Sequence, residues 1–466
     1  MTLAQPKRIS KILVANRNEI AVRIIRAARE LGISTVQAVS AADRAMLAAK
    51  LADGTVEIGP AQASKSYLKA GAIIDAAKAV GADAIHPGYG FLSENADFAA
   101  AVEAAGIIFI GPRAETIRCM GDKAQARAMA AAAGVPTVLG SKDRISNQAD
   151  AAAVAADLGF PLMIKAAAGG GGRGIRIAAT PAELEQALPL ASAEALAAFG
   201  DGGLYLERLI QNARHVEVQI LGDGVDAIHV YERECSLQRR RQKVWEEAPA
   251  ACLNNAARES LCASAVRLAR HVRYRGAGTL EYLYDERTGA FFFIEMNTRI
   301  QVEHPVSEMI TGIDLVQAMI RIAAGGPLGV AQTDVRVNGH AIECRINAED
   351  PEAGFRPCPG EVKEFFVPTG AHIRFDTGLY PGYCVPPFYD SLLGKLIVWG
   401  ASRAEALALM RATLAEVRVD GIKTTIPLHI ALAGDPEVAE MRTNTRWLED
   451  WLERRRAETP AVLAVS

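Results

Sequence analysis

The first hundred residues alternate between short apolar runs and amphipathic stretches. The runs KILVAN from residue 11, ISTVQAV from residue 33 and GIIFIG from residue 106 are typical of buried strands. Between them, residues 19–31 and 67–80 have the apolar spacing of helices. Strands that alternate with helices favour a parallel sheet. Gly111-Pro112 is a breaker pair, which indicates that this unit ends near residue 112.

The pattern changes twice more along the chain. From about residue 121 to 334 a helix and a strand precede a glycine-rich loop, an alanine-rich helix and long charged strands. After residue 335 come short strands with Pro/Gly turns, a helix over residues 403–416 and a small α+β unit. We therefore expect a multidomain protein of the α/β and α+β classes, with domains over residues 1–120, 121–334 and 335–453.

Composition and charge exclude several classes of protein. A net charge of −3 and a pI near 6.3 argue against a nucleic-acid partner. The chain lacks the roughly 18 consecutive apolar residues of a membrane span and has no apolar signal segment near its start. Its seven cysteines are scattered and never have zinc-site spacing. These features favour a reduced, cytoplasmic location without a membrane partner.

The glycine-rich loop is the first candidate for chemistry. KAAAGGGGRG, from Lys165 to Gly174, contains a formal G-x-G-x-x-G, but a strand-like IRIA follows it where a dinucleotide fingerprint needs a helix. The loop also lacks the Lys-Ser/Thr of a P-loop. We expect a flap of two strands and a loop, whose backbone N–H groups suit nucleotide phosphates. A plain hairpin without a ligand is an equal alternative.

A charged hairpin is the second candidate. The segment GTLEYLYDERTGAFFFIEMN predicts two strands with a turn near residues 287–289, which sets Glu281 opposite Glu295. Alternation places Asn297 and Arg299 on the face of Glu295. Two facing carboxylates repel unless a cation lies between them, and such oxygen ligands suit Mg²⁺. The alternative is a solvated charged face, but the flanking FFFI favours burial.

The same face is expected to continue through Gln301 to Glu303, where a carboxylate near Arg299 would suit a general base. Upstream, the segment CSLQRRRQK holds four cations within five positions, and it indicates either a solvated face or a site for an anion. Three histidines, His86, His215 and His304, have no metal-site spacing, and a structural role is the better first interpretation for each.

Taken together, these segments resemble the biotin carboxylase family over almost the whole chain. The resemblance is carried by HPGYGFLSEN from residue 86, MGDK from 120, QRRRQKVWEEAP from 238, EMNTRIQVEHPVSEMITG from 295, HAIECRINAEDP from 340 and PPFYDSLLGKL from 386. It implies an ATP-grasp fold, with a glycine-rich lid at about residues 135–208, and this fold would lie between an N-terminal α/β domain and a C-terminal mixed domain. It also implies ATP-dependent carboxylation of biotin with bicarbonate.

The resemblance further implies site residues. ATP would be held by Lys123, Lys165, Gly171, Gly172, the strand from Glu207 to Ile210, and His215, with Arg241 beside the nucleotide. Mg²⁺ or Mn²⁺ would be held by Glu281, Glu295 and Asn297. Bicarbonate would be bound by Lys243, Arg299 and the backbone of Val302, next to Gln301, with Glu303 as the base and Arg345 stabilising the biotin enolate.

Some positions depart from the family pattern. Arg241 stands where the family usually has a histidine that contacts the nucleotide, and arginine cannot act as a neutral acceptor. Asn18 stands where ANRGEIA is usual, at a turn that favours a positive φ, and asparagine is the next best residue after glycine there. Ala168 shortens the glycine run to four. None of these changes falls on an implied catalytic residue.

The resemblance also implies partners. No Met-Lys-Met biotin-attachment motif occurs, so we expect biotin to arrive on a separate biotin carboxyl carrier protein, with carboxyltransferase subunits and a homodimer as further expectations. One alternative is an ATP-grasp ligase that activates another carboxylate, against which Arg345 and PPFYDSLLGKL count. The other is a non-catalytic relative with a sensing or scaffold role, which the departure at Arg241 suggests and the intact acidic and basic residues oppose.

Overall fold

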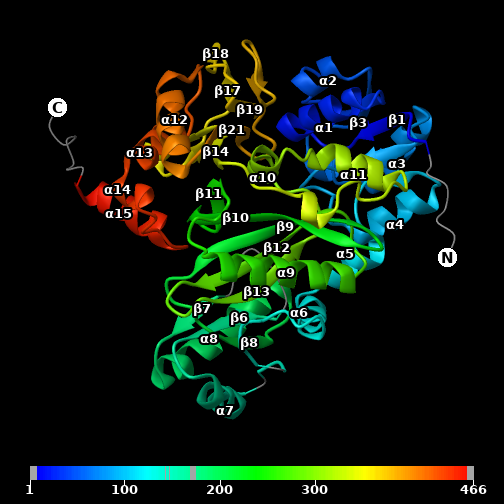
Figure 1. The fold of residues 1–466 in the computed structure, drawn as a ribbon. Coiled ribbons are helices and arrows are strands. Elements are labelled where there is room, and N and C mark those ends of the chain that lie inside the picture. The colour runs from blue at the N-terminus through cyan, green and yellow to red at the C-terminus, as the bar shows by residue number, and fades with distance from the viewer. Residues whose placement is uncertain (1–7, 142, 146, 168–174, 459–466) are drawn as a thin grey trace.

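The computed structural model describes residues 8–141, 143–145, 147–167 and 175–458. Its N-terminal part is a five-stranded sheet in the order β3-β2-β1-β4-β5, with every pairing parallel, as predicted. Figure 1 shows this sheet with its helices at one end of the molecule. The strands are β1 (Lys11–Val14), β2 (Ser34–Ser40), β3 (Gly54–Gly59), β4 (Ala84–His86) and β5 (Ile108–Phe109).

The helices that accompany this sheet differ slightly from those predicted. They are α1 (Asn18–Glu30), α2 (Leu47–Leu51), α3 (Ala70–Ala79), α4 (Ala96–Ala104) and α5 (Ala114–Gly121), with a 3₁₀ turn, η1, at Ala63–Lys65. The predicted helix over residues 67–80 begins only at Ala70. Tyr67 lies before it as a buried side chain whose hydroxyl donates to Asp43 at 2.8 Å, so its apolar ring belongs to the core but not to the helix.

A small three-stranded sheet, in the order β7-β6-β8, forms the lid. Strands β6 (Leu162–Ala166) and β7 (Arg176–Ala178) pair antiparallel, which confirms the predicted strands on both sides of the glycine-rich loop. Gly171 and Gly172 lie outside the described residues. Strand β8 (Leu204–Arg208) lies earlier in the chain than the predicted strand from Glu207 to Ile210, and the two overlap only at residues 207 and 208. The nearby helices are α6 (Lys123–Ala132), α7 (Gln148–Leu158) and α8 (Pro181–Phe199).

An eight-stranded sheet in the order β13-β12-β9-β10-β11-β14-β21-β19 is the centre of the molecule. Its strands are β9 (Arg214–Asp223), β10 (Ala227–Arg239), β11 (Gln242–Ala248), β12 (Arg275–Asp285), β13 (Ala290–Asn297), β14 (His340–Asn347), β19 (Ile373–Thr377) and β21 (Leu392–Gly400). β11 pairs with β14, with Trp245 opposite Cys344. One sheet therefore continues across the expected boundary near residue 335, and it brings C-terminal residues beside the central hairpins.

The remaining elements surround this sheet. They are the helices α9 (Asn255–His271), α10 (His304–Thr311), α11 (Leu315–Ala323), α12 (Arg403–Glu416), α13 (Ile426–Gly434), α14 (Pro436–Ala439) and α15 (Trp447–Glu458), the 3₁₀ turns η2 (Gln332–Asp334) and η3 (Pro351–Ala353), and the short strands β15 (Glu349–Asp350), β16 (Arg356–Pro357), β17 (Gly360–Glu361), β18 (Glu364–Phe366), β20 (Cys384–Val385) and β22 (Arg418–Asp420). Helix α12 has the predicted bounds, and the Ser402 side chain caps it by accepting from Glu405 N.

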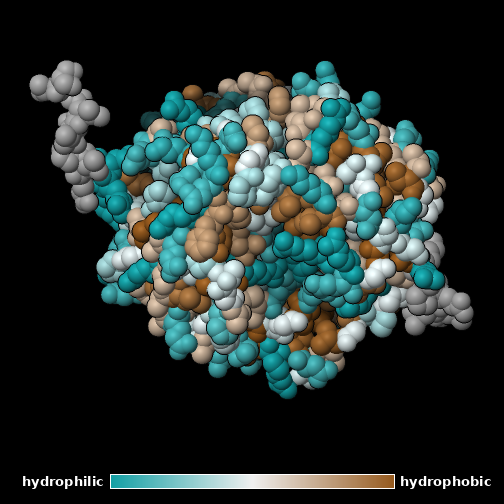
Figure 2. Space-filling view, turned by 90° about the horizontal axis from the view of Figure 1, so that it is seen from above, coloured by the Kyte–Doolittle hydropathy of each residue, from teal (hydrophilic) through white to brown (hydrophobic). Residues whose placement is uncertain are grey.

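One hydrophobic core joins the N- and C-terminal parts. It contains Ile24 of α1, Met319 of α11, Leu396 of β21 and Met410 of α12, all nearly inaccessible to solvent. On the face shown in Figure 2, hydrophobic residues form separate patches among hydrophilic ones. Within the described ranges, no helix combines the length and apolarity needed to cross a membrane. All seven cysteines are free thiols.

Candidate functional site

The predicted pair of carboxylates is present on the hairpin of β12 and β13. Glu281 lies opposite Glu295 in the strand register, and a bulge follows between Glu281 and Tyr282. The Asn297 side-chain amide donates to Glu281 Oε1 at 2.9 Å, so the three side chains share one face as alternation predicts. Burial and the neighbouring Glu281 charge raise the pKa of Glu295.

Lys243 of β11 lies at the centre of three buried carboxylates. Its Nζ donates to Glu281 Oε1 at 2.9 Å, to Glu303 Oε1 at 2.6 Å and to Glu217 Oε2. Burial opposes the charged ammonium, but the three carboxylates raise the pKa of Lys243 well above its usual range. The site therefore holds a charged lysine surrounded by anionic oxygens.

Glu303 immediately precedes helix α10, and its side chain is fully buried. The chain leaves β13 at Asn297, so the expectation that one strand face continues to Glu303 is wrong. The following loop nevertheless returns to the site, because Gln301 Nε2 donates to Glu281 Oε1 at 3.1 Å. Burial opposes ionisation of Glu303, but Lys243 and Arg345 keep its pKa below the usual range, so the carboxylate is ionised at neutral pH.

Arg299 connects this loop to the N-terminal domain. Its Nε donates to Glu94 Oε2 at 2.8 Å, and its Nη2 donates to Asn297 Oδ1 at 2.9 Å. Nη1 lies 3.2 Å from Gln301 Oε1. Glu94 also accepts from the backbone N–H of Thr298 at 2.9 Å. The arginine is thereby held over the loop that carries Gln301.

Arg345 of β14 lies on the C-terminal side of the site. Its Nη2 donates to Glu303 Oε2 at 2.9 Å, and its Nε donates to Glu246 Oε1 at 2.6 Å. Burial, together with the nearby Glu303 charge, raises the pKa of Glu246 to about 7, although Arg345 opposes this shift. The Arg345 guanidinium thus joins two buried carboxylates from two different elements.

His215 of β9 faces the same carboxylates. Its Nε2 lies 3.4 Å from Glu281 Oε2 and 3.7 Å from Glu217 Oε2, without a hydrogen bond among the described residues. Ligand atoms of these three residues lie within 4.8 Å of one another, and so do those of a second group formed by Glu217, Cys235 and Glu303. Burial raises the pKa of Cys235 well above its usual range, so its thiol is not a ready nucleophile.

Two of the residues expected to contact a nucleotide, Lys165 and Glu207, lie on strands of the lid sheet. Lys165 of β6 and Arg127 of α6 both form ion pairs with Glu207 of β8. Lys123, the first residue of α6, is exposed but near enough to Glu295 to lower the pKa of that carboxyl, against the larger effect of burial. Lys165 and Glu207 are therefore brought together, with Lys123 on the side of the hairpin.

The basic run of residues 239–243 does not form one anion site. Arg239 stacks on the Phe355 ring with 3.8 Å between guanidinium carbon and ring centroid. Arg240 and Arg241 form the exposed turn between β10 and β11, where both have positive φ. Arg240 N donates to Glu449 at 2.9 Å, and Lys243 alone of the four cations contacts the buried carboxylates.

Three site residues were missed by reasoning from the sequence. Glu217 could have been found, since it follows His215 by two positions on one strand and so shares its face. Glu246 follows Lys243 by three positions on β11, and only its pairing with β14 shows its contact with Arg345. Glu94 belongs to the N-terminal domain, and no local spacing relates it to Arg299.

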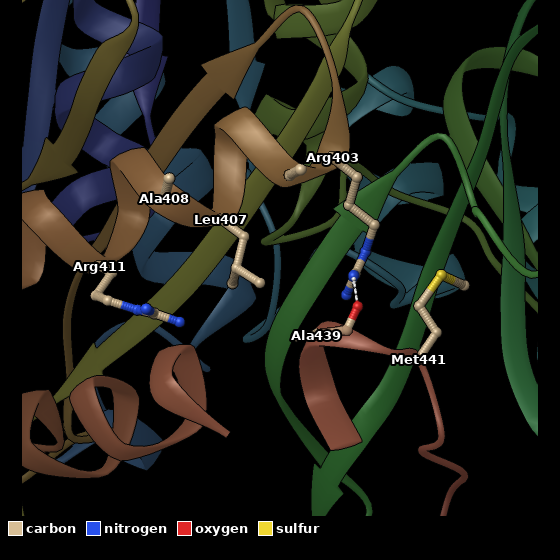
Figure 3. Close-up of a pocket in the computed structure, with 7 residues that line it drawn as sticks. Arg403, Leu407, Ala408, Arg411, Ala439 and Met441 are labelled. Carbon is tan, nitrogen blue, oxygen red and sulfur yellow. Dashed lines mark hydrogen bonds between the residues drawn. The ribbon is translucent and has the colours of Figure 1, made fainter. Parts of the chain in front are cut away.

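A separate surface pocket of about 490 Å³ lies beside α12. It is lined by Arg403, Ala404, Leu407, Ala408, Arg411, Ala439 and Met441. Figure 3 shows Arg403 donating to the Ala439 carbonyl, at 2.7 Å. None of the predicted site residues lines this pocket, so the candidate chemistry belongs to the carboxylate cluster.

The chain matches known protein families along most of its length. Family models match residues 8–117 (biotin carboxylase, N-terminal domain), 122–331 (carbamoyl-phosphate synthase L chain, ATP binding domain) and 343–450 (biotin carboxylase C-terminal domain). The chain is 54% identical over 443 residues to a biotin carboxylase of Pseudomonas aeruginosa, covering 95% of this chain and 98% of that protein.

Solved structures similar to this chain include biotin carboxylases. A biotin carboxylase complex with β-γ-ATP from Campylobacter jejuni is 45% identical, with a TM-score of 0.90 and coverage of 95% of this chain and 99% of that one. The biotin carboxylase domain dimer of Hydrogenobacter thermophilus 2-oxoglutarate carboxylase, with MgADP, ADP and bicarbonate, is 47% identical, with a TM-score of 0.88 and coverage of 96% and 98%. Because sequence and fold agree along nearly the whole chain, it belongs to the biotin carboxylase family.

Proposed function

We propose that this site performs the first half-reaction of a biotin-dependent carboxylase through the residues named below. The substrates are ATP, bicarbonate and biotin. The observation that supports the assignment most directly is the buried, ionised Glu303 carboxylate between Lys243 and Arg345. This is a base next to two cations, which is what proton removal from an anionic substrate requires.

In the proposed reaction, Lys243, Arg299 and the backbone N–H of Val302 hold bicarbonate, with Gln301 beside it. Glu303 accepts the bicarbonate proton, and the freed oxygen attacks the γ-phosphorus of ATP while the bond to the ADP oxygen breaks. The resulting carboxyphosphate divides into CO₂ and phosphate. Phosphate removes the proton of the biotin ureido nitrogen, Arg345 stabilises the enolate oxygen, and the nitrogen attacks CO₂.

Glu281, Glu295 and Asn297 are the proposed ligands of Mg²⁺ or Mn²⁺. They fit such an ion because two carboxylates face each other across the hairpin, and the Glu295 carboxylate has no hydrogen bond or ion pair among the described residues. Bound there with the nucleotide, the metal would neutralise phosphate charge. Asn297 would present its amide oxygen, which accepts from Arg299 in the present arrangement.

The nucleotide is proposed to lie between the lid and the hairpin. Lys165, held by Glu207, and Lys123 supply positive charge at this edge. The proposed nucleotide-binding residues are Lys123, Lys165, Gly171, Gly172, Glu207, Ile210, His215 and Arg241. Arg241 has no hydrogen bond or ion pair among the described residues and is exposed at its turn, so it is available to a ligand.

Biotin is proposed to come on a separate carrier protein, and carboxyltransferase subunits would use the carboxybiotin. A homodimer, a cytoplasmic location and domain boundaries at 1–120, 121–334 and 335–453 belong to the same proposal. The related 2-oxoglutarate carboxylase domain is a dimer in its solved structure.

The test is ADP release by the purified chain with Mg²⁺ and bicarbonate, with and without free biotin. ADP release that depends on both bicarbonate and biotin, and that falls at least about 100-fold in Glu303→Gln, supports the proposal. ADP release without biotin dependence would point to another ATP-grasp acceptor. ATP binding without any ADP release would favour the non-catalytic alternative.

A further inference from the structure

Two buried side chains hold the backbone around Val302 from behind the site. Lys395 Nζ donates to the Val302 carbonyl oxygen at 2.7 Å. His304 Nδ1 lies 2.8 Å from the Gln301 carbonyl oxygen. A carbonyl only accepts, so we assign the proton of His304 to Nδ1. Its Nε2 has no hydrogen-bond partner among the described residues, which agrees with this tautomer.

Burying the Lys395 ammonium group at this position costs desolvation free energy. Its side chain is fully buried, and its counter-ion is the Glu19 carboxylate of α1, itself 1% exposed and 3.1 Å away. Burying a charged pair seldom stabilises a fold by itself, because desolvation offsets the attraction. Glu19 also accepts from the Tyr89 hydroxyl. The ion pair therefore holds the Lys395 ammonium group as a hydrogen-bond donor to the Val302 carbonyl.

Holding these two carbonyls determines where the neighbouring N–H groups point. The peptide unit is planar, so the Gln301 carbonyl fixes the direction of the Val302 N–H. The Val302 carbonyl likewise fixes the Glu303 N–H and the start of α10. Both peptide units that flank Val302 are thus fixed by side chains that are themselves fully buried.

We propose that Lys395 and His304 are positioning residues that aim the Val302 N–H at bicarbonate and set the backbone of Glu303. This inference rests on the proposed function, in which Val302 N–H and Glu303 meet bicarbonate. A preset donor needs no rearrangement when the substrate binds, so loss of either holding contact weakens bicarbonate binding more than ATP binding.

The first experiment separates positioning from stability at Lys395. Lys395→Met alone leaves Glu19 buried without its counter-ion, so the informative variant is Lys395→Met with Glu19→Gln, which leaves neither charge. We expect about a tenfold higher KM for bicarbonate and a KM for ATP within about twofold of wild type. Arg258→Gln is the control, because it breaks a partly buried ion pair with Glu232 elsewhere and should leave the bicarbonate KM unchanged.

A wild-type bicarbonate KM in the double variant, or an equal rise in the KM for ATP, would overturn the role of Lys395. The second experiment compares His304→Asn with His304→Leu. The Asn amide nitrogen can replace Nδ1 as donor, whereas Leu cannot donate. We expect the Asn variant to stay within about twofold of the wild-type bicarbonate KM and the Leu variant to exceed it about tenfold.

Equal bicarbonate KM values for the two His304 variants would refute the hydrogen-bond mechanism. Failure of the proposed function itself is distinguishable, because wild-type chain would then release no ADP in response to bicarbonate and biotin. Circular dichroism and unfolding midpoints of every variant identify loss of folding, which would lower the active fraction without changing KM.

Discussion

At the scale of single residues, the backbone shows why asparagine replaces the usual glycine at position 18. Asn18 has φ 57°, in the left-handed region where asparagine is tolerated. Its side-chain amide donates to the Leu392 carbonyl, so the residue also connects α1 with β21. A Cβ at position 378 would lie only 2.5 Å from Asn18 Oδ1, so glycine at 378 is required for this packing.

These contacts predict different effects for two substitutions. Asn18→Ala loses the hydrogen bond and keeps the left-handed strain, so the free energy of unfolding should fall by about 2 kcal/mol. Asn18→Gly loses the same bond but relieves the strain, so the loss should stay below about 1 kcal/mol. Urea unfolding of both variants checks this. Equal losses for Ala and Gly would show that backbone strain has no part in the choice of residue.

At the scale of elements, the β12–β13 hairpin has two facing carboxylates, and it predicts a metal-dependent stability. Without metal, burial and the charge of Glu281 raise the pKa of Glu295 in the folded chain. The fold therefore loses stability as pH rises through that pKa and Glu295 ionises. Glu295→Gln should therefore unfold about 2 °C higher than wild type at pH 7.5 in EDTA. With saturating MgADP the wild type should unfold at the higher temperature, because the variant lacks one of the proposed metal ligands.

Thermal unfolding with and without MgADP measures this. Glu416→Gln, an exposed change at the end of α12, is the control and should behave as wild type in both conditions. A Glu295→Gln variant that is less stable than wild type in EDTA would mean that the facing carboxylates do not repel. If MgADP raises the unfolding temperature of Glu295→Gln as much as that of wild type, Glu295 is not one of the metal ligands.

The same elements show how far the sequence alone could predict the site. Alternation and a short turn determine the hairpin register, so Glu281 opposite Glu295 was predictable. The end of β13 at Asn297 was not, because a loop that turns back gives no periodic signal. The contacts of Lys243 with Glu217 and of Arg299 with Glu94 depend on packing between distant elements, which no local spacing encodes.

At the scale of the whole molecule, one sheet and one core join parts far apart in sequence, and both the N- and the C-terminal part hold a buried histidine, His86 on β4 and His429 on α13. Burial lowers the pKa of His86 to about 3 and of His429 to about 4, against about 6.5 in an unfolded chain. His429 Nε2 lies 2.7 Å from the Arg345 carbonyl, which requires a proton on that nitrogen, and the lowered pKa leaves the ring neutral at pH 7.

Because these folded pKa values are depressed, the unfolded chain binds more protons between about pH 6.5 and 4, and stability falls as pH falls through that window. Each histidine should cost about 3 kcal/mol by pH 4. His429→Gln keeps a donor for the Arg345 carbonyl but does not titrate. Its free energy of unfolding, measured by urea titration from pH 7 to 4.5, should therefore fall less steeply with pH than that of wild type. The difference in slope should correspond to about one bound proton. Parallel slopes would mean that the folded chain does not lower the pKa of His429.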